Sequence, residues 1–467
     1  MIRIFRHYIS RAYLWLLLIE FIVFFNAMYF GSNVRFLVTE SWYSEHDITF
    51  ASLIFSVVVS LSCLGLGLYR RTLSGEEYNL VARVCVSFGI AIFAVVSIYY
   101  LLPEFHVARS VLMYAMGFAF IGIMLTRYLF SKIANFDRLK RRVLVVGSGK
   151  KAAQLVTIND SFIHRGFNIV GFLALPEETI TVDSSLLIPY DKKIMEIAED
   201  FKVDEIVIAL EENRHEENRH GLPLDELLDC KMSGLTILNV VSFYEREQGL
   251  ISLDNVNPSW LVFCDGFAQG DFRSLEKRFF DIFASLILLL VAWPFMLLTA
   301  LAIYLESGFK GPIFYRQVRV GENNINFDVL KFRSMKTDAE KNGAQWAKQN
   351  DDRITKVGKF IRMSRIDELP QIFNVLRGDM SFVGPRPERP VFVEGFNERI
   401  PYYRERHRVK PGITGWAQLC YPYGADENDT IQKLQYDLYY VKNYSLFLDF
   451  SIMFNTVEVI LWGKGAR

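Results

Sequence analysis

Four long apolar segments fill the first 130 residues of the chain. They cover approximately residues 13–30, 50–68, 84–102 and 107–130. Each is about long enough to cross the hydrocarbon core of a membrane as a helix. No small-residue cleavage site follows Phe30, so we expect the first segment to be an uncleaved anchor rather than a signal peptide. The pattern predicts a transmembrane four-helix bundle within residues 1–135.

After Arg142 the long apolar segments give way to short apolar runs that alternate with helical patterns. Strands are expected at 143–146, 169–173 and 205–210, with a helix at 191–201. Between the first strand and the helix that follows it lies the turn Gly147-Ser148-Gly149. Strands alternating with helices are typical of a doubly wound sheet. We therefore predict a Rossmann-like α/β domain over residues 140–265.

The turn Gly147-Ser148-Gly149 can hold a pyrophosphate at a helix N-terminus, but this fingerprint alone is weak. A dinucleotide site also needs an acidic residue at the end of the second strand, and that strand ends in Leu173-Ala174-Leu175. Glu177 and Glu178 come later, in a loop. We favour a structural or regulatory role over NAD binding, and whether the domain binds a nucleotide stays open. The charged stretch 211–220, EENRHEENRH, is interpreted as a solvated loop.

A fifth apolar run, 282–305, is long enough to span a membrane, but Pro294 lies in its middle. Positive charge also flanks both of its ends, whereas a spanning helix has one side poor in Lys and Arg. The flanking cations are Arg273, Lys277, Arg278, Lys310, Arg316 and Arg319. We expect a re-entrant membrane helix over 279–305 that enters and leaves the cytoplasmic leaflet. A kinked full span is the alternative, because Pro is tolerated within membrane helices.

Charge also orients the four-helix bundle. Basic residues precede its first segment and follow its second and fourth segments, while the other two loops carry mainly acidic residues. The basic residues are Arg3, Arg6, Arg11, Arg70, Arg71, Lys132, Arg138, Lys140, Arg141 and Arg142. By the positive-inside rule both ends of the bundle are cytoplasmic. Everything that follows the bundle is then expected on the cytoplasmic face.

Residues 364–388 carry the candidate chemistry. Their apolar positions recur every three or four residues, which predicts a helix with one buried stripe. The stripe consists of Ile366, Leu369, Phe373 and Leu376. Pro370 places the beginning of this helix near Asp367, and Gly378 places its end.

Asp367 and Glu368 then lie beside the positive end of the helix dipole, where carboxylates stay ionised. For an adjacent acid pair alone, an N-cap and a solvated neighbour would be the simpler interpretation. The loop that follows favours chemistry instead. Pro385 and Pro387 fix Arg386 on a rigid segment, which suits a guanidinium that meets an anion.

This block closely resembles the signature of the bacterial sugar transferases, the polyprenyl-phosphate glycosyl-1-phosphate transferases. Three further motifs match in order: Tyr315-Arg316-Gln317, Lys331-Phe332-Arg333-Ser334-Met335 and Lys410-Pro411-Gly412-Ile413-Thr414-Gly415-Trp416. The resemblance implies that residues 271–467 form an α+β catalytic domain on the bilayer, with the re-entrant helix. The four spans and the nucleotide-binding-like domain before it match the long form of this family, which serves exopolysaccharide biosynthesis.

The resemblance implies transfer of a hexose-1-phosphate from a UDP-sugar to polyprenyl phosphate, with release of UMP. By that resemblance Asp367 is the nucleophile that takes the phosphosugar, and Glu368 is a ligand of Mg²⁺. Two anionic phosphates must approach each other, so cations are needed, and Mg²⁺ suits one or two carboxylates plus phosphate oxygens. The substrate-binding candidates are Arg316, Arg319, Lys331, Arg333, Pro385, Arg386 and Asp437. Asp437 matches an acidic position of the family, without a physical argument for its role.

Two smaller expectations concern the same catalytic domain. Short strands are predicted at 313–315 and 327–331, around the polar turn 321–324. The C-terminal segment 446–462 is predicted as an interfacial helix rather than a sixth span, because Asp449, Asn455 and Glu458 interrupt it.

Composition sets the class of partner and the compartment. The 52 basic and 52 acidic residues give no argument for nucleic acid. Five Cys, scattered without metal-ligand spacing, fit a reducing compartment. The expected location is the bacterial inner membrane, and the expected partners are a UDP-hexose, polyprenyl phosphate and the lipid bilayer. The resemblance also admits a homodimer and other polysaccharide-assembly enzymes, but it does not indicate the donor hexose, the oligomeric state or the pathway.

Two other functions would use parts of this sequence. A membrane-anchored nucleotide-sugar dehydratase would need a second glycine fingerprint and a Tyr-x-x-x-Lys pair in the C-terminal half. The pair present, Tyr128 with Lys132, ends a membrane segment instead. A non-catalytic assembly platform for polysaccharide export would not need the intact acid pair and the Pro-Arg-Pro loop.

Overall fold

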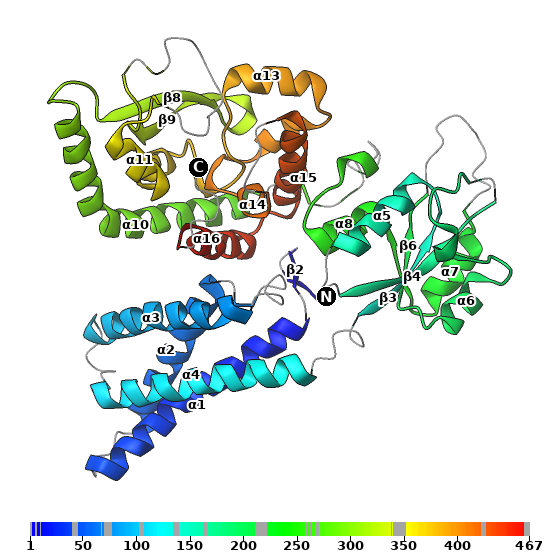
Figure 1. Cartoon of the computed structure of the whole chain (residues 1–467), viewed down its shortest axis with the longest axis horizontal. Helices are drawn as coiled ribbons and strands as arrows, with labels where there is room; N and C mark the ends of the chain where they lie inside the picture. The colour runs from blue at the N-terminus through cyan, green and yellow to red at the C-terminus, as the bar shows by residue number, and fades with distance from the viewer. Residues whose placement is uncertain are drawn as a thin grey trace. The chain divides into compact units, whose positions relative to one another are not determined.

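The computed structural model shows a membrane bundle, an α/β domain and a C-terminal domain (Figure 1). Two compact units make up the chain, one mainly of residues 11–257 and one mainly of 258–467. The structure describes residues 2–4, 7–9, 11–39, 45–66, 68–69, 77–101, 107–133, 140–161, 166–176, 178–210, 222–256, 260, 264, 266–267, 270–337, 339, 352–421 and 426–461. The loop 211–220, the basic residues Arg6, Arg70, Arg71 and Arg138, and Glu177 lie outside the described residues.

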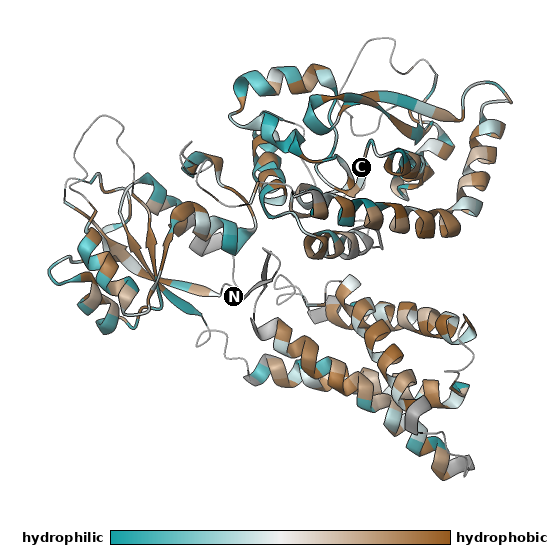
Figure 2. Cartoon of the chain, turned by 180° about the vertical axis from the view of Figure 1, so that it is seen from behind, coloured by the Kyte–Doolittle hydropathy of each residue, from teal (hydrophilic) through white to brown (hydrophobic). Residues whose placement is uncertain are grey.

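The four predicted membrane segments are helices long and apolar enough to span a bilayer. They are α1 (Arg11–Thr39), α2 (Glu45–Gly65), α3 (Glu77–Leu101) and α4 (Arg109–Ile133). Figure 2 shows hydrophobic residues on their outward faces as well as between them. Gly31 lets α1 approach α4 closely, because a Cβ there would lie 2.8 Å from the carbonyl oxygen of Val111. Small residues at such crossings are typical of helix packing in membranes.

One ion pair inside the bundle was not predicted. Glu20 on α1 is fully buried, and its Oε1 lies 3.0 Å from Nε of Arg127 on α4. The hydroxyl of Tyr69 donates to Oε2 of Glu20 at 2.5 Å. Charged residues within membrane helices face the bundle interior and pair, as these do. The pair fixes α1 against α4.

The α/β domain has the predicted doubly wound form. Its five parallel strands lie in the order β5-β4-β3-β6-β7. The strands are β3 (Arg141–Val146), β4 (Phe167–Leu173), β5 (Leu187–Ile188), β6 (Glu205–Ile208) and β7 (Thr236–Asn239), and the helices are α5 (Lys150–Ser161), α6 (Ile194–Asp200), α7 (Leu224–Met232) and α8 (Val240–Gln248). The order reverses between β3 and β6, which is where such sheets bind ligands.

The glycine turn at that point already holds an anion, the carboxylate of Glu178. Its Oε2 accepts from the backbone N–H of Ser148 at 2.8 Å, and its Oε1 accepts from that of Gly149 at 3.0 Å. Gly147 has a φ of 122° and packs under Ala209, so the turn requires glycine there. The N–H groups that hold a pyrophosphate in dinucleotide-binding folds therefore bind a carboxylate of the same chain.

The C-terminal domain begins with α10 (Asp271–Glu306), a helix of 36 residues with Pro294 inside it. The helix continues through Pro294 without interruption. Figure 1 shows α10 bent part-way along, and Pro294 supplies the reason because it cannot donate to the preceding turn.

A β-hairpin and a short parallel pair complete the sheet structure of this domain. β8 (Phe314–Val320) pairs antiparallel with β9 (Asn326–Phe332) around the predicted polar turn. The strand predicted at 313–315 is therefore too short. β10 (Ser381–Val383) pairs in parallel with β11 (Gly412–Thr414).

Short helices surround these strands. They are α11 (Lys356–Met363), η6 (Ile366–Gln371), α12 (Ile372–Arg377), α13 (Pro390–Arg399), η7 (Tyr403–Arg408), α14 (Trp416–Cys420), α15 (Glu427–Asn443) and α16 (Leu446–Leu461). α16 is not one of the helices long enough to span. The sequence analysis took Asp449 as a polar residue that would keep this segment at the membrane interface. Asp449 is instead fully buried inside the protein, so that argument does not hold.

Candidate active site

The acid pair lies on a tighter helix than predicted. Residues 366–371 form the 3-10 helix η6, which passes into α12 and ends at Gly378 with a φ of 98°, as predicted for its end. A 3-10 helix has three residues per turn, whereas an α-helix has 3.6. Over six residues the direction of a side chain therefore differs by about 120° between the two kinds of helix. The predicted apolar stripe is therefore wrong: Phe373 is exposed, whereas Asp367 and Glu368 are buried.

Asn374 fixes this segment against the hairpin. Its amide Nδ2 donates to the Asp328 carbonyl at 2.7 Å, and its Oδ1 accepts from the Leu330 N–H at 3.0 Å. Both bonds go to backbone groups of β9, the strand that carries Lys331. Asn374 thereby sets the register of the acid pair against Lys331, and the sequence analysis did not single it out.

Two cations share one oxygen of Glu368. Lys331 Nζ and Arg386 Nη2 each lie 3.0 Å from Glu368 Oε1. Burial by itself raises the pKa of the Glu368 carboxyl, but the charges of Lys331 and Arg386 outweigh it and hold that pKa well below its usual range. Glu368 is therefore a permanent anion in the site.

Asp367 differs from its neighbour in its contacts and in the direction of its pKa shift. Its side chain does not cap η6, which is preceded by Arg365 in a left-handed conformation. Its buried Oδ1 accepts no hydrogen bond from any residue that the structure describes. Burial, together with the nearby charge of Glu368, raises the pKa of Asp367 to about 6. The pair thus combines one stably charged carboxylate with one free carboxylate that titrates near neutrality.

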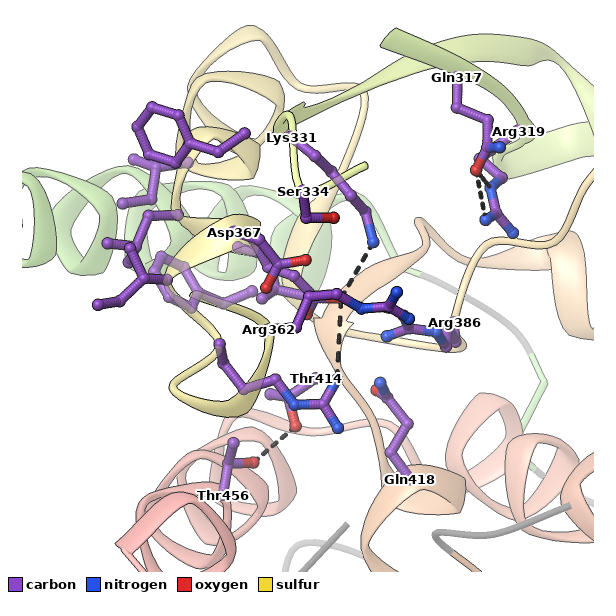
Figure 3. Close-up of a pocket in the computed structure, with 18 of the residues that line it drawn as sticks. Gln317, Arg319, Lys331, Ser334, Arg362, Asp367, Arg386, Thr414, Gln418 and Thr456 are labelled. Carbon is purple, nitrogen blue, oxygen red and sulfur yellow. Dashed lines mark hydrogen bonds and ion pairs between the residues drawn. The ribbon is translucent and has the colours of Figure 1, made fainter. Parts of the chain in front are cut away.

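Two further arginines have unused donors. Nη1 of Arg333 and Nη1 of Arg362 are buried, and neither donates a hydrogen bond within the described part of the chain. Buried guanidinium nitrogens without an acceptor are costly unless an anion meets them. Figure 3 shows Arg362, Asp367, Lys331 and Arg386 directed toward one space.

That space is a cavity of about 1380 Å³. Its polar wall carries the acid pair and the cations, and it includes Gln418, whose buried Oε1 finds no donor among the described residues. Its other wall is apolar and is formed by α10 and α16, with Phe283, Ile287, Val291, Phe450 and Met453. The cavity therefore joins a cationic region to a hydrophobic surface.

The structure brings most of the predicted site residues to this cavity. Lining it are Asp367, Glu368, Arg319, Lys331, Arg333, Arg386 and Asp437. Arg316 is not among the lining residues: successive side chains of β8 alternate between faces, and Arg316 is on the exposed one. Pro385 does not line it either, and its carbonyl accepts from the Gly412 N–H at 3.0 Å, which anchors the loop.

Asp437 contacts the loop indirectly. Its buried Oδ2 lies 2.7 Å from Nη2 of Arg406, and the same nitrogen donates to the backbone carbonyl of Arg386 at 3.1 Å. Asp437 therefore supports Arg386 through Arg406, which gives it the physical role that the sequence alone did not supply.

A divalent cation fits the acid pair. Among the residues described, no cluster of three or more His, Cys, Asp or Glu side chains surrounds a metal-sized point. Mg²⁺ does not need one, because it commonly uses one or two carboxylates, with waters and substrate phosphates completing its shell. Asp367 Oδ1 has no other partner in this part of the structure, and Glu368 has a second oxygen besides the one shared by Lys331 and Arg386.

Comparison with known proteins matches two parts of the chain to family models. A family model described as bacterial sugar transferase matches residues 272–463, and one described as a CoA-binding domain matches residues 65–219. The UDP-glucose:undecaprenyl-phosphate glucose-1-phosphate transferase of Klebsiella pneumoniae is 30% identical over 94% of this chain and 93% of its own length. The undecaprenyl-phosphate glucose phosphotransferase of Komagataeibacter xylinus is 32% identical, over 82% of this chain and 71% of the relative.

A third relative is more similar over a shorter stretch of the chain. The UDP-N-acetylgalactosamine-undecaprenyl-phosphate N-acetylgalactosaminephosphotransferase of Aeromonas hydrophila is 44% identical over 52% of this chain. That match spans little more than half of the relative, 56% of its length. Together with the cavity and its acid pair, these matches show that the chain belongs to the bacterial sugar transferase family of undecaprenyl-phosphate sugar-phosphate transferases.

Proposed function

We propose that this enzyme transfers a hexose-1-phosphate from a UDP-sugar to polyprenyl phosphate through a phosphosugar bound covalently to Asp367. The observation that carries the proposal is the buried Oδ1 of Asp367, which accepts no hydrogen bond among the described residues and lies within the influence of the charges of Lys331, Arg362 and Arg365. A carboxylate in this position is a competent nucleophile toward phosphorus.

The reaction divides into two displacements. An oxygen of Asp367 attacks the phosphorus attached to the sugar, and the bond from that phosphorus to the bridging oxygen breaks, so UMP leaves with the electron pair. A phosphate oxygen of the polyprenyl phosphate then attacks the same phosphorus. The bond to Asp367 breaks, which regenerates its carboxylate and yields the polyprenyl diphosphosugar. No proton has to be transferred in either step.

Cations of this chain offset the charge of the two phosphates. Arg333 and Arg362 offer buried nitrogens without partners in the described structure, and Lys331 and Arg386 flank the acid pair. Such preorganised donors act strongly in a site from which water is excluded. Asp367 and Glu368 would hold Mg²⁺, and the bound ion would supply further neutralisation of the diphosphate.

The apolar wall suits the acceptor lipid. Residues of α10 and α16 continue the cavity away from the acid pair, so a phosphate beside Asp367 can carry its hydrocarbon chain along these helices. An α10 that crossed the membrane fully would separate its ends by a bilayer, and an unbent helix of this length would measure about 54 Å.

Contacts at both ends of α10 favour the re-entrant form instead. Near its beginning, Arg278 donates to the carbonyls of Val375 and Leu376 at 2.6 and 2.7 Å. At its end, Glu306 Oε1 accepts from the Val357 N–H at 3.1 Å. Both ends thus contact the same domain, which we place on the cytoplasmic face of the bacterial inner membrane.

A direct assay tests the function. Purified protein in lipid is incubated with polyprenyl phosphate and, in turn, UDP-glucose and UDP-N-acetylgalactosamine, the donors named in the relatives. We expect UMP and a lipid diphosphosugar in equal amounts from at least one UDP-hexose. Release of UDP in place of UMP would contradict the proposal, because it would mean that the sugar moves without its phosphate.

A further inference from the structure

The loop that carries Arg386 is held by its backbone at two points. The hydroxyl of Tyr440 lies 2.9 Å from the carbonyl oxygen of Val383, where the loop leaves β10. At the other end, Arg406 holds the Arg386 carbonyl and is itself paired with Asp437. Tyr440 and Asp437 lie three residues apart on α15, so one face of that helix supports both ends of the loop.

Tyr440 belongs to a buried charged cluster. Its hydroxyl oxygen accepts from Lys277 Nζ at 3.2 Å, and its single proton is shared between the Val383 carbonyl and Asp449 Oδ1, which lies 2.7 Å away. Lys277 Nζ also lies 2.6 Å from Asp449 Oδ2. All three side chains are less than a tenth exposed. Lys277 is on α10, Tyr440 on α15 and Asp449 on α16, so the cluster joins the membrane helix to two helices of the catalytic domain.

The membrane helix also contacts β10 directly, one turn after Lys277. Oδ1 of Asp281 accepts from the Ser381 hydroxyl at 2.9 Å and from the Phe382 N–H at 3.0 Å. Residues 381–383 lead directly into the Arg386 loop. The beginning of α10 therefore fixes the strand from which the loop departs, through Asp281 directly and through Lys277 by way of Tyr440.

We propose that Lys277, Tyr440 and Asp449 are positioning residues: by holding the Val383 carbonyl they set Arg386 against Glu368, so the geometry of the acid pair depends on the docking of membrane helix α10. This inference rests on the proposed function of the acid pair. Apolar side chains of similar volume would serve stability as well as a buried ion pair does, whereas only directed donors and acceptors fix one carbonyl in one place.

Tyr440→Phe is the sharpest test, because it removes one hydroxyl and keeps the ring. Loss of one buried hydrogen bond from a reacting geometry should lower kcat for UMP release roughly three- to tenfold. Tyr444→Phe is the matched control. Its ring packs on that of Tyr440 with centroids 6.0 Å apart, and no hydrogen bond joins its hydroxyl to Val383 among the described residues. We expect the control to keep wild-type kcat.

A double-mutant cycle separates positioning from stability. If Tyr440 acts through Arg386, Tyr440→Phe should cost less than about twofold in an Arg386→Lys background, where the guanidinium it positions is already gone. A role that does not act through Arg386 would lower the rate, per mole of folded protein, by the same factor in both backgrounds. Equal factors, or a wild-type rate for Tyr440→Phe alone, would overturn the inference.

Lys277 supplies a second variant. Lys277→Arg should restore most of the rate that Lys277→Met loses, because arginine can still donate to Asp449. Both variants are compared after purification as intact membrane protein, with melting temperature as the measure of folding. Failure of the wild type to release UMP would refute the proposed function; an active wild type with Lys277→Met equally active would refute only the positioning role.

Discussion

Arg386 Nη2 lies 3.0 Å from Glu368 Oε1, and the rigid Pro-Arg-Pro loop and the acid pair therefore form one electrostatic unit. Lys331 shares the same oxygen. With two cations on it, Glu368 stays ionised, and its charge in turn disfavours ionisation of the buried Asp367. Two adjacent carboxylates thus have different tasks, set by their surroundings rather than by their chemical type.

This relationship predicts a pH dependence. The pKa of Asp367 is raised to about 6, and the attacking form is the carboxylate, so the rate of UMP release without lipid acceptor should fall as pH falls through about 6. Glu368→Gln removes the like charge and leaves Lys331 and Arg386 uncompensated, so the acid limb of the residual activity should move to lower pH. The measurement is a single-turnover pH profile of both proteins. A limb that stays in place or moves upward would contradict the assignment.

Arg362 should bind substrate, although the sequence analysis did not include it. Its buried Nη1 has no acceptor among the described residues, and it lies on the cavity wall. Arg362→Lys keeps the positive charge but loses the planar guanidinium, which can donate two parallel hydrogen bonds to a phosphate. The KM for the UDP-sugar should therefore rise roughly tenfold. Arg377→Lys, on an exposed position of α12, is the control and should leave KM unchanged. Equal effects of the two substitutions would remove Arg362 from the site.

Glu178 should exclude diphosphates from the α/β domain. Wild-type protein is expected to bind neither pyrophosphate nor CoA at the glycine turn, because the carboxylate already occupies its N–H groups. Glu178→Ala should gain pyrophosphate binding, and the Ser148 and Gly149 amides should exchange hydrogen faster without ligand. Glu199→Ala, an exposed change in α6, is the control for both readouts. Tight CoA binding by the wild type with protection of these amides would show that Glu178 yields to the ligand.

Both ends of α10 should face the cytoplasm. Ser274 and Lys310 are exposed near the two ends, so single cysteines there, in a chain without its native cysteines, should react from the same side in oriented vesicles. Lys277 does not suit this experiment, because it is buried against Asp449. Labelling of the two positions from opposite sides would mean that α10 crosses the bilayer.

The sequence predicted regular elements well where one period dominates. The apolar runs of β3, β4 and β6 and the four membrane helices were found in this way. β7 was missed because its residues Thr236–Asn239 are only partly buried and carry no continuous apolar run. The stripe around Phe373 was wrong because the 3.6-residue period does not hold across the 3-10 helix η6.

The sequence was sufficient to predict which residues belong to the candidate site, but not how their side chains contact one another. Motif positions identified Asp367, Glu368, Lys331 and Arg386, and the structure brings these four together. Had the length of β8 been known, the alternation of side chains along a strand would have placed Arg319 and Arg316 on opposite faces, with only Arg319 directed toward the site. By contrast, Lys277 read as a membrane-flanking charge, because its partner Asp449 is 172 residues away in sequence.

The central claim is that Asp367 forms a covalent phosphosugar, and one experiment tests it most directly. Enzyme is incubated without lipid acceptor with UDP-sugar labelled in the sugar, and intact-mass spectrometry follows the protein while UMP is quantified. Wild type should release at most one UMP per active site and retain one sugar phosphate, which maps to the peptide containing Asp367. Asp367→Asn, which is isosteric and keeps the fold, should do neither, whereas Asp379→Asn should behave as wild type. An active enzyme without the adduct, or full turnover by Asp367→Asn, would contradict the account.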